Sequence, residues 1–144
     1  MADPRHPRGL LDTSVVIDLQ RLEEASLPAE LAVSSLTLAE LAAGPHATED
    51  AEERARRQER LQRVEATFDP LPFDGDAARA YGRIYASVVV AGRKARGRRA
   101  IDLMIAAVAL AARLPLYTMN ADDFDGLGEL IDIVPVRTPR PRTP

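Results

Sequence analysis

Four carboxylates in this sequence lie where short apolar segments end or begin: Asp12, Glu40, Asp102 and Asp123. Carboxylates that share a site repel one another and raise one another's pKa values. A hard divalent cation relieves this repulsion, and Mg²⁺ binds through few carboxylates while it keeps several waters. Such a cation activates water and stabilises charge on a phosphoryl group. If the fold brings them together, these four residues therefore indicate metal-assisted hydrolysis of a phosphate ester.

Two of the four carboxylates also have a structural explanation at a helix start. Asp12 can cap the helix that follows it, a role that contributes about 1 kcal/mol. Glu40 can form a capping box with Thr37, which precedes it by three residues. Either role taken singly is more common than catalysis, so the argument for a metal site depends on all four residues together.

The other two carboxylates have structural alternatives as well. Asp102 can pair with Arg98 or Arg99 on a helix surface, where such a pair contributes little to stability. Asp123 can cap a short helix or lie in a solvated turn. Asp102 nevertheless opens a helix that is otherwise almost entirely apolar, and Asp123 follows a strand. We expect all four carboxylates to converge on one edge of a sheet.

The elements that position these residues are short apolar segments that alternate with segments of helical periodicity, which is typical of a parallel sheet covered by helices on both faces. We predict an α/β fold with three layers, α/β/α, and a central, mostly parallel sheet of about five strands. Ligands bind such sheets beyond the carboxyl ends of the strands. The predicted strands are 9–12, 31–37, 68–73, 114–118 and 130–136. The predicted helices are 14–22, 37–44, 74–90 and 100–113, with a solvated pair of helices over 49–63.

Length and composition limit the possible chemistry. The chain of 144 residues is long enough for one domain, which we place at 9–136, after a lead-in at 1–8 and before a Pro/Arg-rich tail at 137–144. The absence of cysteine excludes thiolate metal sites, and His6 and His46 are the only histidines. Oxygen ligands then favour Mg²⁺ or Mn²⁺ over zinc. No apolar stretch is long enough for a signal peptide or a membrane span, so we expect a cytoplasmic protein.

Four segments in a fixed order resemble the PIN-domain ribonucleases, and most closely the VapC-type toxins of bacterial type II toxin–antitoxin pairs. They are LLDTSVVID, SSLTLAELAAG, RRAIDLMIAAVAL and LYTMNADDF, and the resemblance extends over 9–136. It implies a metal-dependent endoribonuclease that hydrolyses RNA phosphodiesters by metal-activated water, with Mg²⁺ or Mn²⁺ as cofactor. It also implies tRNA, rRNA or mRNA as substrate, inhibition by a cognate VapB-type antitoxin, a homodimer and the bacterial cytoplasm.

The resemblance also implies roles for individual residues. Many relatives carry aspartate where this chain has Asn120, so the fourth acidic group is left open between Asn120, Asp122 and Asp123. The region between the second and third predicted strands is implied to receive the antitoxin. The implied catalytic residues are Asp12, Glu40, Asp102 and Asp123, of which Asp12 and Asp102 bind the metal directly, and the implied lining residues are Thr13, Ser14, Thr118 and Asn120.

A basic segment, GRKARGRRA at 92–100, directly precedes Asp102. Arginine and lysine bind phosphates independently of sequence, and this segment can therefore balance an acidic site that must approach RNA. We predict that Arg98 and Arg99 line the substrate site, with a solvated loop as the alternative. The basic residues of the segment are Arg93, Lys94, Arg96, Arg98 and Arg99.

Three other functions are compatible with parts of the sequence. A non-catalytic PIN-fold module that binds RNA or protein would keep the fold, and Asn120 leaves that possibility open. A different metal phosphohydrolase, such as a DNA nuclease or a small phosphatase, would use the same sheet edge. A response-regulator-like domain is disfavoured, because it needs a lysine late in the chain and the only lysine is Lys94.

Overall fold

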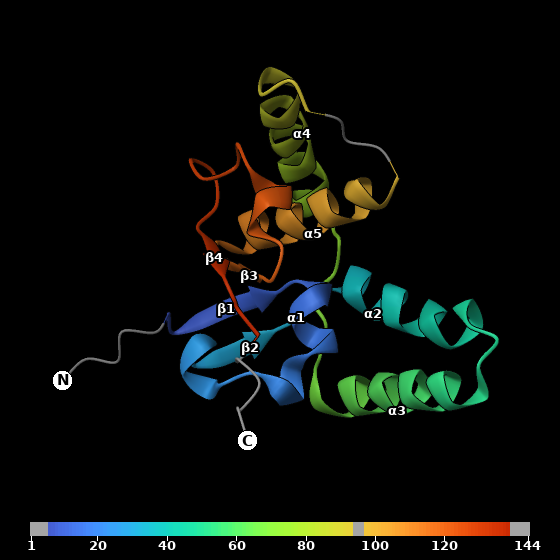
Figure 1. Cartoon of the computed structure of the whole chain (residues 1–144). Coiled ribbons are helices and arrows are strands. Elements are labelled where there is room, and N and C mark those ends of the chain that lie inside the picture. Colours follow the sequence, from blue (N-terminus) through green and yellow to red (C-terminus); the bar gives the residue numbers. More distant parts are fainter. Residues whose placement is uncertain (1–5, 94–96, 139–144) are drawn as a thin grey trace.

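A computed structural model describes residues 6–93 and 97–138, and Figure 1 shows the path of the chain. The predictions for Lys94, Arg96 and the side chain of Arg98 lie outside the described residues, as do the ends of the predicted lead-in and tail. Among the described residues, no helix combines the length and the apolar character that crossing a bilayer requires.

The centre of the molecule is a parallel sheet of four strands in the order β2-β1-β3-β4. A fifth strand was expected at 68–73, and there the structure has a single parallel bridge between Leu71 and Ser34. Pro70 and Pro72 flank that bridge, and proline has no N–H to donate to a ladder. The strands are β1 (Arg8–Leu11), β2 (Glu30–Ala32), β3 (Leu116–Thr118) and β4 (Ile133–Pro135).

Helices cover both faces of the sheet, so the predicted α/β/α architecture is confirmed. Side chains alternate along each strand, and Leu10 and Leu116 belong to one hydrophobic cluster while Leu11 and Tyr117 belong to the other. The first cluster includes buried residues of α4 (Gly75–Val90) and α5 (Arg98–Ala112). The second includes residues of α1 (Thr13–Ile17), α2 (Ser35–Ala43) and α3 (Ala51–Thr67).

The helices α2 and α3 differ from the sequence prediction in two ways. First, α2 begins at Ser35 and its N-cap is Ser34, whose hydroxyl accepts from the Thr37 N–H at 3.2 Å. Thr37 and Glu40 therefore lie within the helix and form no capping box. Second, residues 51–67 form one continuous helix, which projects beside α2 as a hairpin away from the sheet (Figure 1).

Short 3-10 turns complete the connections between these elements: η1 (Leu19–Arg21), η2 (Glu24–Ser26), η3 (Gly44–Ala47) and η4 (Ala121–Phe124). Because all four strands are parallel, their carboxyl ends meet at a single edge of the sheet. Asp12 directly follows β1 at this edge, and η4 follows β3 there. The edge is therefore where a ligand site is expected in this class of fold.

Candidate acidic site

Asp12 is the central carboxylate of the candidate site. It is only 4% exposed, and it caps α1 at the end of β1. Its Oδ1 accepts from the Thr13 N–H at 2.9 Å. Its Oδ2 accepts from the Ser14 hydroxyl at 2.9 Å and from the Thr118 hydroxyl at 2.8 Å. The helix-capping role and the site role thus coincide in one residue.

The surroundings of Asp12 disfavour its charged form. Burial raises the pKa of the Asp12 carboxyl above its usual value, and the three hydrogen bonds lower it only in part. The negative charge of Asp123 raises this pKa further, so the two carboxylates are close enough to interact electrostatically. A buried carboxylate within electrostatic reach of a second carboxylate is an arrangement that a bound cation stabilises.

Glu40 reaches the site through a chain of hydroxyl groups. The Thr13 hydroxyl donates to Glu40 Oε1 at 2.7 Å and lies 2.9 Å from the Thr37 hydroxyl. Because a threonine hydroxyl has a single hydrogen, Thr37 is the donor to Thr13. Ser34 in turn donates to Thr37 at 3.4 Å. This series of hydrogen-bonded hydroxyls ends on the Glu40 carboxylate and holds it next to Thr13, the residue that follows Asp12.

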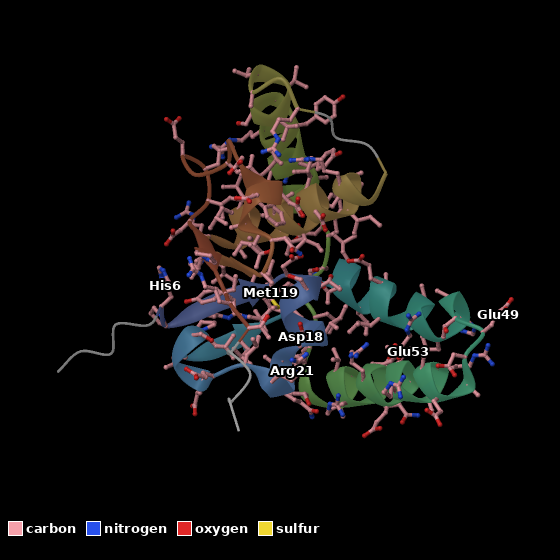
Figure 2. All side chains as sticks on the ribbon, in the orientation of Figure 1. His6, Asp18, Arg21, Glu49, Glu53 and Met119 are labelled. Carbon is pink, nitrogen blue, oxygen red and sulfur yellow. The ribbon has the colours of Figure 1, made fainter. Side chains whose placement is uncertain are left out.

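The end of β3 is hydrogen bonded to the Asp12 carboxylate. The Thr118 hydroxyl donates to Asp12 and also accepts from the Asn120 N–H at 3.0 Å. The Ser14 hydroxyl accepts from the Met119 N–H at 3.2 Å, and Figure 2 shows Met119 beside α1. Two hydroxyls from separate elements therefore fix Asp12 relative to the segment that leads into η4.

Arginine side chains hold η4 in place. The Asp123 N–H donates to the Asn120 carbonyl at 2.9 Å, and the Asp123 carbonyl accepts from Arg99 Nη2 at 2.9 Å. Arg93 Nη1 donates to the Asp122 carbonyl at 3.1 Å and lies 3.2 Å from a carboxylate oxygen of Asp125. The basic segment thus contacts the acidic turn directly.

Asp102 is half-buried on α5, one turn after Arg99 on the same helix face. The same helix carries Arg99, which holds the turn that includes Asp123. Asn120, Asp122 and Asp123 are all exposed, and the hydrogen bonds described above use their backbone groups rather than their side chains.

The residues present fit a hard divalent cation that keeps most of its waters. Over 6–93 and 97–138, no three acidic or histidine side chains are grouped closely enough to hold a metal ion. A carboxylate offers about four lone-pair positions, and the contacts at Asp12 occupy three, which leaves one on Oδ1. Mg²⁺ commonly binds through one or two carboxylates plus waters. This donor set therefore suits Mg²⁺ or Mn²⁺ better than an ion that demands a closed cage.

Two features of this site differ from what the sequence predicts. Thr37 was interpreted as a helix cap, although its spacing of three residues from Glu40 places both side chains on one face of a helix. Arg93 was considered only as an RNA contact, although its backbone partner belongs to η4. Both contacts join residues that only tertiary structure brings together.

Replacing Thr118 by valine is expected to lower the free energy of unfolding by about 1–3 kcal/mol, because buried Asp12 and the Asn120 N–H both lose a hydrogen-bond partner. Urea denaturation in EDTA measures this change. Thr118→Ser keeps the hydroxyl and should retain most of the stability. If Thr118→Val were as stable as the wild type and Thr118→Ser were destabilised, packing of the methyl group rather than the hydroxyl would be what Thr118 contributes.

Comparison with known proteins gives a consistent result. The sequence profile of the PIN domain matches residues 9–130, a range that contains all four carboxylates. Ribonuclease VapC5 of Mycobacterium tuberculosis is 41% identical over 122 residues, 83% of this chain and 87% of the relative. The crystal structure of VapBC-5, a toxin–antitoxin system from Mycobacterium tuberculosis, matches with a TM-score of 0.77 and 40% identity over 91% of this chain and 98% of that chain. FitAcB from Neisseria gonorrhoeae matches with a TM-score of 0.69 and 26% identity over 86% of this chain and 94% of that chain.

Proposed function

Because this chain belongs to the PIN-domain family and, within it, to the VapC ribonucleases, we propose that it is a metal-dependent endoribonuclease toxin whose activity a cognate antitoxin inhibits. The observation that carries this proposal is the buried Asp12 at the carboxyl end of β1, with the charge of Asp123 acting on it. A purely structural helix cap needs neither the burial nor a second carboxylate beside it. Both features fit a site that a cation completes.

In the proposed site, Asp12 and Asp102 hold Mg²⁺ or Mn²⁺, and Asp123 supplies the further negative charge. When bound, the cation supplies an activated water and stabilises charge on the phosphoryl group. Glu40 is held by Thr13 in the position to accept or orient a proton at the site. Thr118 and Ser14 keep the Asp12 carboxylate oriented toward the edge of the sheet. The effect of Asp123 on Asp12 favours Asp123 over Asn120 and Asp122 as the fourth group.

The test is cleavage of total cellular RNA by the purified protein, with Mn²⁺ and with EDTA. Discrete fragments that appear only with Mn²⁺ support a metal-dependent endoribonuclease, and their ends identify the target as tRNA, rRNA or mRNA. Cleavage of equal extent in EDTA would contradict the metal requirement. Cleavage of DNA in preference to RNA would favour the other phosphohydrolases that the sequence allowed.

We propose that the antitoxin docks in a groove between α1 and α3. The groove has a volume of about 580 Å³, and its apolar floor includes Val16, Leu31 and Val64. Figure 2 shows Asp18 and Arg21, from the end of α1 and from η1, near the C-terminal end of α3. The walls carry four arginines against two carboxylates, so they favour a segment with an apolar face and acidic flanks. The charged lining residues are Asp18, Arg21, Arg56, Glu59, Arg60 and Arg63.

Replacing Arg60 by glutamate is expected to weaken antitoxin binding by about tenfold or more, which corresponds to about 1.4 kcal/mol. Arg60 lines the groove and, among the described residues, is in no ion pair, so the change breaks no internal contact of that kind. Calorimetry with the cognate antitoxin measures the affinity. Arg83→Glu on α4 is the control, because it makes the same change in charge outside the groove. An equal loss of antitoxin affinity in Arg83→Glu would mean that the antitoxin does not bind specifically in this groove.

The alternative of a non-catalytic PIN-fold module rests on Asn120, which adds no charge where many relatives have aspartate. That module would bind RNA equally well in EDTA and would not cleave it. The homodimer and the bacterial cytoplasm stay predictions. Exposed apolar side chains on α4 are the surface on which to look for a dimer contact: Tyr85, Val89 and Val90.

A further inference from the structure

The sequence predicts that Arg99 contacts RNA, but its side chain hydrogen bonds to another part of the protein. Its Nη2 donates to the backbone carbonyl of Asp123 at 2.9 Å, and its Nε is buried without a hydrogen-bond partner among the described residues. The side chain is half-buried at the first turn of α5. A guanidinium free to bind phosphates would have its donors in water. In Arg99 the Nε is buried and Nη2 hydrogen bonds to the acidic turn, so this end of the guanidinium faces the protein.

The position of Arg99 connects two of the proposed acidic residues. Asp102 is three residues later on the same face of α5, and Asp123 belongs to η4, which follows a different strand. The Asp123 peptide is held from both sides, because Asn120 binds its N–H and Arg99 binds its carbonyl. Of these two bonds, the one from Arg99 connects η4 to α5, the helix that carries Asp102.

We infer that Arg99 is a positioning residue of the acidic site: through the Asp123 carbonyl it fixes η4 against α5, and so fixes the spacing of Asp123 and Asp102 around the cation. The inference rests on the proposed function, since it takes both carboxylates as part of one metal site. Arg93 holds the same turn from its outer side, at Asp122 and Asp125. The turn therefore stays attached when Arg99 is replaced, and Phe124 of η4 stays in the hydrophobic cluster that includes α5, but the hydrogen bond from α5 to the Asp123 carbonyl is lost.

A positioning role for Arg99 and a simple charge effect predict opposite changes in Mn²⁺ affinity when Arg99 is replaced. A positive charge beside a cation site weakens cation binding, so its removal alone would strengthen the binding of Mn²⁺. If Arg99 acts by position, Arg99→Gln weakens Mn²⁺ binding by about tenfold or more, because the carboxylates are no longer held together. Arg99→Lys keeps a donor for the Asp123 carbonyl. It should recover most of the Mn²⁺ affinity that Arg99→Gln loses, since a single hydrogen bond joins Arg99 to this carbonyl.

The experiment measures Mn²⁺ dissociation constants by electron paramagnetic resonance for the wild type, Arg99→Gln, Arg99→Lys and Arg83→Gln, an exposed charge control on α4. Weaker binding in Arg99→Gln alone, with recovery in Arg99→Lys, supports the inference. Tighter or unchanged binding in Arg99→Gln overturns it. RNA affinity is measured in EDTA by fluorescence anisotropy, and a loss there without a change in Mn²⁺ binding would also overturn it in favour of a phosphate contact.

Hydrogen exchange in EDTA tests the positioning role without any metal. The Asp123 amide should exchange faster in Arg99→Gln than in the wild type, because the Asp123 carbonyl has lost its hydrogen bond to α5. Unchanged exchange overturns the inference. If the wild type bound no Mn²⁺, the proposed metal function would fail, whereas the exchange data would still decide whether Arg99 holds the turn.

Discussion

Asp12→Asn protein is expected to bind RNA and to leave it intact, with cleavage reduced by about 10³-fold or more. Loss of the bound cation removes several kcal/mol of charge stabilisation in the transition state, and each 1.36 kcal/mol is tenfold in rate. Asparagine has the same shape as aspartate and is an equally good N-cap. The Ser14 and Thr118 hydroxyls can rotate to suit the amide. The variant should therefore fold normally, so that the missing activity reports on chemistry.

The measurement is the initial rate of RNA cleavage in Mn²⁺, with RNA affinity measured separately. Asp132→Asn serves as the matched control, since Asp132 is exposed, pairs with His6 and immediately precedes β4 at the opposite edge of the sheet. Overexpression in bacteria gives a second readout, in which the wild type arrests growth and Asp12→Asn does not. Cleavage by Asp12→Asn at the wild-type rate would remove Asp12 from the mechanism.

The overall fold was accessible from the sequence because its signals are local. Short apolar segments that alternate with helical periodicity predicted the three layers, and the resemblance to PIN domains that four segments carried is confirmed by a match over 9–130. Asp12 could be placed at the carboxyl end of the first strand, because the periodicity changes directly after it. The strand predicted at 68–73 is reduced to one bridge, for which its prolines are a local reason.

The links between the acidic residues were not accessible, because they depend on side chains brought together by tertiary structure. Nothing local distinguishes Thr37 as a member of a hydroxyl chain from Thr37 as a helix cap, and Ser34 performs the capping instead. The contact of Arg99 with Asp123 joins residues 24 positions apart. A charged segment is usually solvated. The sequence therefore does not indicate that Arg93 and Arg99 donate hydrogen bonds to backbone carbonyls.

Mn²⁺ is expected to raise the melting temperature of the wild type and to leave that of Asp12→Asn unchanged. A ligand present at 100 times its dissociation constant stabilises the fold by about 2.7 kcal/mol. For a chain of this length the corresponding rise is roughly 5–10 °C. Asp102→Asn should also lose most of the rise, because Asp102 is the second proposed ligand. Differential scanning calorimetry with Mn²⁺ and with EDTA measures each variant, and an equal rise in all three proteins would contradict the assignment of the site.

The dependence of these melting temperatures on pH identifies Asp12 specifically. The folded state raises the Asp12 pKa above its unfolded value, so the folded protein binds the proton more tightly and charged Asp12 destabilises the fold at higher pH. In EDTA the wild type should therefore melt below Asp12→Asn at neutral pH. That difference should shrink as the pH falls through the raised pKa toward the ordinary aspartate value. Protons and cation compete for the same carboxylate, so the Mn²⁺-induced rise should fade over the same range. A difference in EDTA that grew as the pH fell would mean that Asp12 is stabilised as a charged group, and burial could not then be the reason it needs a cation.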